Sequence, residues 1–170
     1  MHENEFVSHL PSNIRLGYTL AKSLRIAAIS KPRDFSSLNL NDDEKINSED
    51  VITTYMLKTC LILLFIDNQK NDVAFSASNC RWAEMIYRRL RKCIAARKLE
   101  TYYGDGVLFQ CGDHADDDRV DRVCCQKRLL IVRMCDGILE FLVNNRRELQ
   151  AVLSDDRAKS RLQTSYSSTK

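Results

Sequence analysis

The stretch TTYMLKTCLILLFI, from Thr53 to Ile66, decides the fold. It opens with two hydroxyls, an aromatic ring and a lysine, and becomes continuously apolar from Cys60 onward. A segment that is apolar on every side is typical of a helix buried in the core. The hydroxyl of Thr53 or of Thr54 can accept a hydrogen bond from a backbone amide one turn on and so cap this helix. The stretch therefore predicts a buried helix whose first turn stays accessible.

The composition of the whole chain agrees with a helical protein. Its 170 residues are 44% hydrophobic, which is enough for one domain with a real core. Only 5 glycines and 2 prolines are present, too few for many short strands and tight turns. The expected fold class is therefore all-α, a helical bundle over residues 14–150. The polar segments 1–13 and 151–170 predict a flexible N-terminus and a disordered tail.

Apolar spacing of three to four residues predicts further helices on both sides of the central stretch. These helices cover Ile14–Ile29, Ser78–Arg97 and Arg119–Glu148. The single tryptophan, Trp82, is the expected anchor of the second of them. The segment Leu99–Phe109 holds two glycines and paired tyrosines, which favours an extended crossing segment rather than a helix.

The charge, the hydropathy and the cysteines of the chain limit the class of protein and the cellular compartment that we expect. A formal net charge of +3 does not by itself indicate a nucleic-acid-binding protein. No apolar run approaches the roughly 18 to 20 residues that cross a bilayer, and the N-terminus has no secretory pattern, so no membrane contact is expected. The seven cysteines form no disulfide framework. We expect reduced thiols and a cytoplasmic protein, with the nucleus as the alternative.

Catalytic and metal-binding patterns are weak. The only clustered metal ligands suited to zinc are Cys111, His114, Cys124 and Cys125. Neighbouring residues on a helix point about 100° apart. Cys124 and Cys125 can therefore bind one zinc ion only if the helix starts after them. There is no Gly-Ser dipeptide, no glycine-rich phosphate loop and no carboxylate pair in strand-like sequence. We therefore expect no metal site, no cofactor and no catalytic centre in this chain.

Two stretches carry candidate binding residues near the central helix. One line of the first long helix carries Arg15, Tyr18, Lys22 and Arg25. This line is either a solvated basic face or an edge that faces phosphate. The second interpretation arises because like charges at this spacing repel each other unless an anion lies among them. The start of the central helix adds Tyr55 and Lys58. A helix start with a hydroxyl, a ring and an ammonium suits a phosphate attached to a base, whereas the plainer interpretation is an ordinary threonine cap.

The tryptophan helix carries a second candidate surface. Arginines and lysines cover most of its polar side, and such a run is either simply solvated or a contact surface for a nucleic-acid backbone or an acidic protein partner. The residues selected for that surface are Arg81, Arg88, Arg91 and Lys92.

Three blocks resemble the Mab-21 (male-abnormal-21) family, which includes the cyclic GMP-AMP synthase-like receptors. TTYMLKT resembles the family signature Ser-Ser-Tyr-His-Leu-Lys-Thr, and RLGYTLAKSLRI resembles the helix that begins the C-terminal lobe. KLETYYGDGVLF, which follows the tryptophan helix, resembles the family's Lys/Arg-Leu-x-x-Tyr-Phe segment with its following Asn-Leu-Phe. The blocks span Ile14 to Phe109 in family order. Met56 replaces the histidine, both serines are threonines, and the cysteine and histidine cluster of the vertebrate DNA sensor is absent.

This resemblance implies the all-helical C-terminal lobe, of the helix-hairpin-helix or helix-two-turns-helix type. It implies that Tyr55 stacks on the base of ATP or GTP, that Thr54 donates to a phosphate and that Lys22 neutralises the triphosphate. Lys58 matches a family lysine and is grouped with them. The resemblance implies magnesium and a nucleoside triphosphate only for a longer relative that has an N-terminal nucleotidyltransferase lobe. We therefore expect this chain to be inactive alone.

Overall fold

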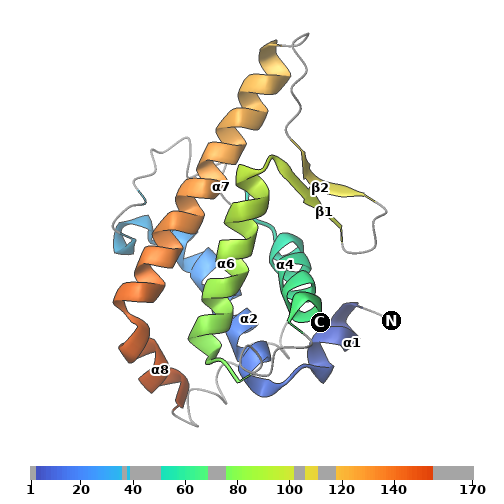
Figure 1. The fold of residues 1–170 in the computed structure, drawn as a ribbon. Helices are drawn as coiled ribbons and strands as arrows, with labels where there is room; N and C mark the ends of the chain where they lie inside the picture. The colour runs from blue at the N-terminus through green and yellow to red at the C-terminus, as the bar shows by residue number, and fades with distance from the viewer. Residues whose placement is uncertain are drawn as a thin grey trace.

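A computed structural model describes residues 3–35, 38, 51–68, 76–101, 106–110 and 118–154 of the chain. The described part is mostly helical, as expected, and adds one two-stranded hairpin (Figure 1). In chain order the elements are α1 (Glu3–His9), α2 (Ser12–Ser30), the 3-10 helix η1 (Pro32–Asp34), α4 (Thr54–Asp67), α6 (Asn79–Ala95), β1 (Lys98–Glu100), β2 (Val107–Gln110), α7 (Asp118–Asn144) and α8 (Arg146–Ser154).

Helix α6 lies at the centre of the bundle, with α7 and α4 on its two sides and α2 packed against it (Figure 1). Its apolar stripe points inward, and Trp82 and Tyr87 are both completely buried. The Oγ of Ser78 caps this helix by accepting from the amide of Arg81 at 3.3 Å. The prediction that Trp82 anchors the core through this helix is therefore confirmed.

Helix α4 has the burial that its sequence predicts. Leu57, Cys60 and Leu61 have no solvent exposure, because α4 packs against both α2 and α6. Thr53 is the cap: its backbone is extended, and its Oγ1 accepts from the amide of Met56 at 3.1 Å. The choice that the sequence left open between two threonines is thus decided in favour of the first.

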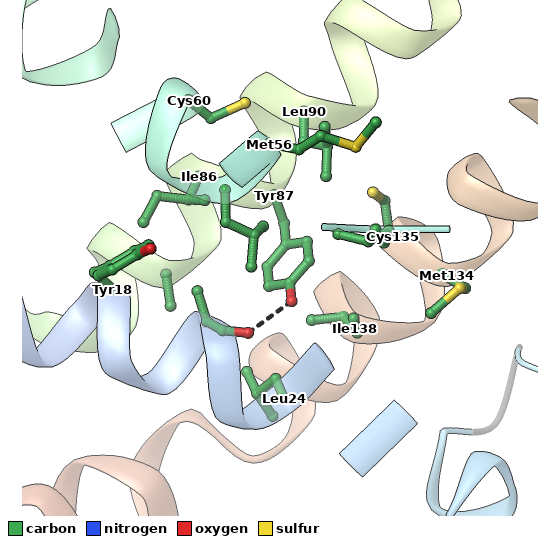
Figure 2. Packing of buried hydrophobic residues seen from close by; sticks show 14 of the residues in the cluster. Tyr18, Leu24, Met56, Cys60, Ile86, Tyr87, Leu90, Met134, Cys135 and Ile138 are labelled. Carbon is green, nitrogen blue, oxygen red and sulfur yellow. Dashed lines mark hydrogen bonds between the residues drawn. The ribbon is translucent and has the colours of Figure 1, made fainter. Parts of the chain in front are cut away.

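The ring of Tyr87 lies where α2, α4, α6 and α7 meet (Figure 2). Its Oη donates to the backbone carbonyl of Ala21 at 2.7 Å, which ties α6 to α2 inside the core. Burial raises the pKa of this phenol well above its ordinary value. Because a buried hydroxyl is costly without a partner, this bond accounts for a tyrosine rather than a phenylalanine at the position.

The segment after α6 contains two strands that form a hairpin, so the prediction of extended chain rather than helix is confirmed. The predicted crossing path is corrected to a hairpin, and the all-α fold class is corrected to mostly helical with one small sheet. Strands β1 and β2 pair antiparallel, with Leu99 opposite Phe109. Both of these side chains are buried, so the hairpin closes one end of the core with its apolar face. Arg97 adopts a φ of 63°, a left-handed conformation that ends α6 and turns the chain into β1.

The two ends of the described chain hold more helix than the sequence pattern predicts. Within residues 1–13, α1 forms, and the ring of Phe6 meets that of Phe65 edge-on with centroids 5.5 Å apart. The predicted final helix is divided into α7 and α8 at Asn145. Helix α8 continues to Ser154 because Leu153 is buried against the core. Residues 155–170, most of the predicted tail, lie outside the described part.

Among the helices of the described ranges, none has both the length and the apolar character needed to cross a membrane.

Candidate functional site

One line of α2 faces the start of α4. The Oη of Tyr18 lies 3.5 Å from the backbone carbonyl oxygen of Thr54, to which it donates. The ammonium of Lys22 lies 5.0 Å from the centre of the Tyr18 ring. One turn further, Nη1 of Arg25 donates to the carbonyl of Ile52 at 2.6 Å. The structure therefore brings Lys22 to the first turn of α4 by way of the ring of Tyr18.

This arrangement revises the interpretation of the basic line of α2. Tyr18 is buried, and the guanidinium of Arg25 is held by a backbone carbonyl, so these residues are not a solvated face. Only Arg15 is exposed in the manner expected of such a face. The positive charges of this line need no anion to offset their repulsion, because the ammonium of Lys22 lies over a π face and the guanidinium of Arg25 donates to a carbonyl oxygen.

The first turn of α4 presents its residues unequally. Thr53 is used as the cap, whereas the side chain of Thr54 is exposed. Tyr55 and Lys58 are half-buried. Of the four residues assigned to nucleotide binding, Thr54 is thus the most accessible, and Lys22 is half-buried above Tyr18.

The basic surface of α6 contains a carboxylate that sequence reasoning missed. Glu84 is only 2% exposed, and its Oε1 accepts from Nη1 of Arg81 at 2.7 Å and from Nε of Arg88 at 2.8 Å. Its Oε2 accepts from Nη2 of Arg146, on α8, at 2.9 Å. Burial alone would raise the pKa of Glu84, but the hydrogen bonds and charges of Arg81 and Arg88 outweigh it and lower that pKa.

The sequence spacing of Glu84 from two of its three arginines could have predicted their contact. Glu84 stands three residues after Arg81 and four before Arg88, which are the distances at which helical side chains meet. Arg146 is 62 residues away from Glu84 in sequence, so no local pattern identifies it. Only the packing of α8 against α6 brings it to the carboxylate.

The remaining predicted surface residues are also largely paired. Arg91 donates through Nε and Nη2 to both carboxylate oxygens of Asp136 on α7, which raises the pKa of Arg91. Lys92 is exposed. The selected residues therefore do not form a uniform row of unpaired cations, because Arg81, Arg88 and Arg91 each contact a carboxylate.

The possible metal ligands of this chain are its histidine, cysteine and acidic side chains. Within the part of the chain that the structure describes, no group of three or more histidine, cysteine or acidic side chains is arranged to hold a metal ion. Cys111 and His114 lie outside that part. Helix α7 begins at Asp118, before Cys124 and Cys125, so these adjacent thiols point in different directions.

No protein-family model, curated protein or solved structure matches this chain. The resemblance to the Mab-21 family therefore rests on the three sequence blocks themselves.

Proposed function

We propose that this chain is the helical C-terminal lobe of a Mab-21-like nucleotidyltransferase. In this proposal the edge between α2 and the first turn of α4 binds ATP or GTP, and catalysis belongs to a nucleotidyltransferase lobe. The observation that carries it is the placement of Lys22 over Tyr18 while Tyr18 contacts Thr54. That placement joins two of the three blocks on which the resemblance rests.

The chemistry of each side chain suits the role proposed for it. The ammonium of Lys22 has three donors, so it can donate to a phosphate while it stays over the ring of Tyr18. The exposed hydroxyl of Thr54 can donate to a second phosphate oxygen. Tyr55 offers a ring for the base, and Lys58 adds a positive charge one turn further along α4.

The expected affinity is low. Stacking of one base contributes about 1 to 3 kcal/mol, and each charge-assisted hydrogen bond contributes about 1.5 to 3 kcal/mol. Association costs at least about 4 kcal/mol. With one stacked base and two such bonds, the difference is at most about 5 kcal/mol, which corresponds to a Kd of about 0.2 mM or weaker, as expected for one wall of a site.

The test is an NMR titration of the isotope-labelled chain with ATP or GTP. We expect amide shifts to concentrate at Lys22, Thr54 and Tyr55 at millimolar nucleotide. The variant Lys22→Gln should weaken these shifts, whereas Lys92→Gln removes the same charge from the exposed side of α6 and should leave them unchanged. Shifts that avoid these residues, or an equal loss in both variants, would refute the proposal.

A further inference from the structure

Three arginines converge on the buried carboxylate of Glu84, and we call Arg81, Arg88 and Arg146 the arginine cluster. The three side chains are 51%, 59% and 46% exposed, whereas Glu84 is 2% exposed. The carboxylate is therefore the inner part of the cluster, and the guanidinium groups form its outer surface. Two helices contribute to it, α6 and α8.

The cluster carries more positive charge than its carboxylate can balance. Three arginines against one glutamate leave a local surplus of two positive charges. Each guanidinium has five N–H donors and uses one nitrogen for Glu84. Among the described residues, these three guanidinium groups make no other hydrogen bond or ion pair. Donors thus remain available on the exposed side.

A purely structural role needs fewer arginines than this. One bidentate arginine satisfies a buried carboxylate, and further guanidinium groups at the same oxygen repel each other. An anion placed on the exposed side would relieve that repulsion. Because Glu84 already holds Arg81 and Arg88, their side chains lose less conformational freedom when such an anion binds.

The surroundings of Arg146 favour a peptide over a nucleic-acid backbone. A surface hollow of about 460 Å³ lies at the junction of α7 and α8 and is lined by Val143, Asn144, Arg146, Arg147 and Glu148. Val143 is 52% exposed and lines this hollow together with Arg146, so an apolar side chain lies beside one arginine of the cluster. A duplex would need a long surface of one charge. Here Asp136 neutralises Arg91, so the positive surface does not continue along α6 beyond the arginine cluster.

We propose that the arginine cluster is a docking site for an acidic segment of a partner protein. Carboxylates of that segment bind the exposed donors of Arg81, Arg88 and Arg146, and an apolar side chain enters the hollow beside Val143. The site is independent of the edge formed by α2 and α4, so its failure would leave the nucleotide proposal untouched.

The test uses the full chain and a fluorescent glutamate-rich peptide that contains leucines, with binding followed by anisotropy. Arg88→Gln should weaken binding about tenfold, the loss expected from one charge-assisted hydrogen bond. Lys92→Gln is the matched control, since it removes one exposed charge from the same helix without a contact to Glu84. It should change the affinity less than about twofold, a change too small for a lost direct contact.

Folding is checked by circular dichroism, and Arg146→Lys serves as a second variant. Lysine keeps the charge but not the guanidinium fork, so binding should also weaken in that variant. Absent binding, or equal losses in Arg88→Gln and Lys92→Gln, would overturn the proposal. Tighter binding of duplex DNA or RNA than of the peptide, with affinity falling steeply between about 50 and 200 mM salt, would replace it with a nucleic-acid surface.

Discussion

Gly17 of α2 lies directly against Trp82 of α6, with no room for a side chain between them. A Cβ atom at Gly17 would stand 2.5 Å from the Cβ of Trp82 and 2.7 Å from the backbone oxygen of Asn79. Glycine inside a helix costs about 1 kcal/mol relative to alanine. Here that cost is offset by the close approach of α2 to α6, the helix on which the other main helices pack.

The variant Gly17→Ala should therefore be destabilised. The added methyl group meets backbone and a buried tryptophan, which cannot move aside cheaply, and we expect a loss of about 1 to 3 kcal/mol in the free energy of unfolding. Urea denaturation followed by circular dichroism measures this loss. Gly106→Ala is the control, because its nearest neighbour would be the Cγ2 of Thr101 at 3.7 Å. An unchanged urea midpoint in Gly17→Ala would contradict the packing.

Replacement of each of the two adjacent threonines at the start of α4 by alanine should change the stability of the fold by different amounts. Thr53→Ala removes the hydroxyl that accepts from the amide of Met56, and the loss of such a cap costs about 1 kcal/mol. Thr54→Ala removes an exposed hydroxyl and should stay within about 0.5 kcal/mol of the parent. Thermal unfolding of the two variants side by side tests this difference. Equal destabilisation would show that the cap is shared or misassigned.

Acid should weaken the fold partly through Glu84. The pKa of this carboxyl is lower in the folded chain than in the unfolded chain, so its ionised form stabilises the fold at neutral pH. This contribution is complete above the unfolded pKa, about 4.3, and is lost as pH falls from there through the lowered folded pKa. Stability measured in urea across that range should fall accordingly.

Glu84→Gln is the control for this pH dependence. At neutral pH the variant should lose about 2 kcal/mol, because three guanidinium groups lose their charged acceptor. Below the folded pKa of Glu84 the difference between variant and parent should shrink, since the parent carboxyl is then neutral as well. A constant difference at every pH would show that the charge of Glu84 does not contribute to stability.

The thiols of the core should resist alkylation. Cys60 and Cys135 are completely buried, and burial raises the pKa of both, so the reactive thiolate is scarce and shielded. Cys93, Cys124 and Cys125 are half-buried and should react before these two core thiols. Maleimide labelling with peptide mass spectrometry gives the order, and urea should remove the protection. Early labelling of Cys60 or Cys135 in the native chain would contradict the described core.

The sequence by itself determined the helices whose own side chains require burial in the core. The run from Cys60 to Ile66 has no polar side, so water exclusion requires most of it to lie in the core. The apolar stripe around Trp82 likewise predicts which side of α6 is buried. In both cases the signal is local, because burial of a helix follows from the side chains along that helix.

Only the tertiary structure decided the contacts between distant segments. Leu99 pairs with Phe109 because both can cover the same end of the core, and Arg146 reaches Glu84 because α8 folds back on α6. The same packing turned the basic line of α2 toward α4 and paired Arg91 with Asp136. The free energy of such pairs depends on distance and burial, which are properties of the folded chain and not of spacing along the sequence.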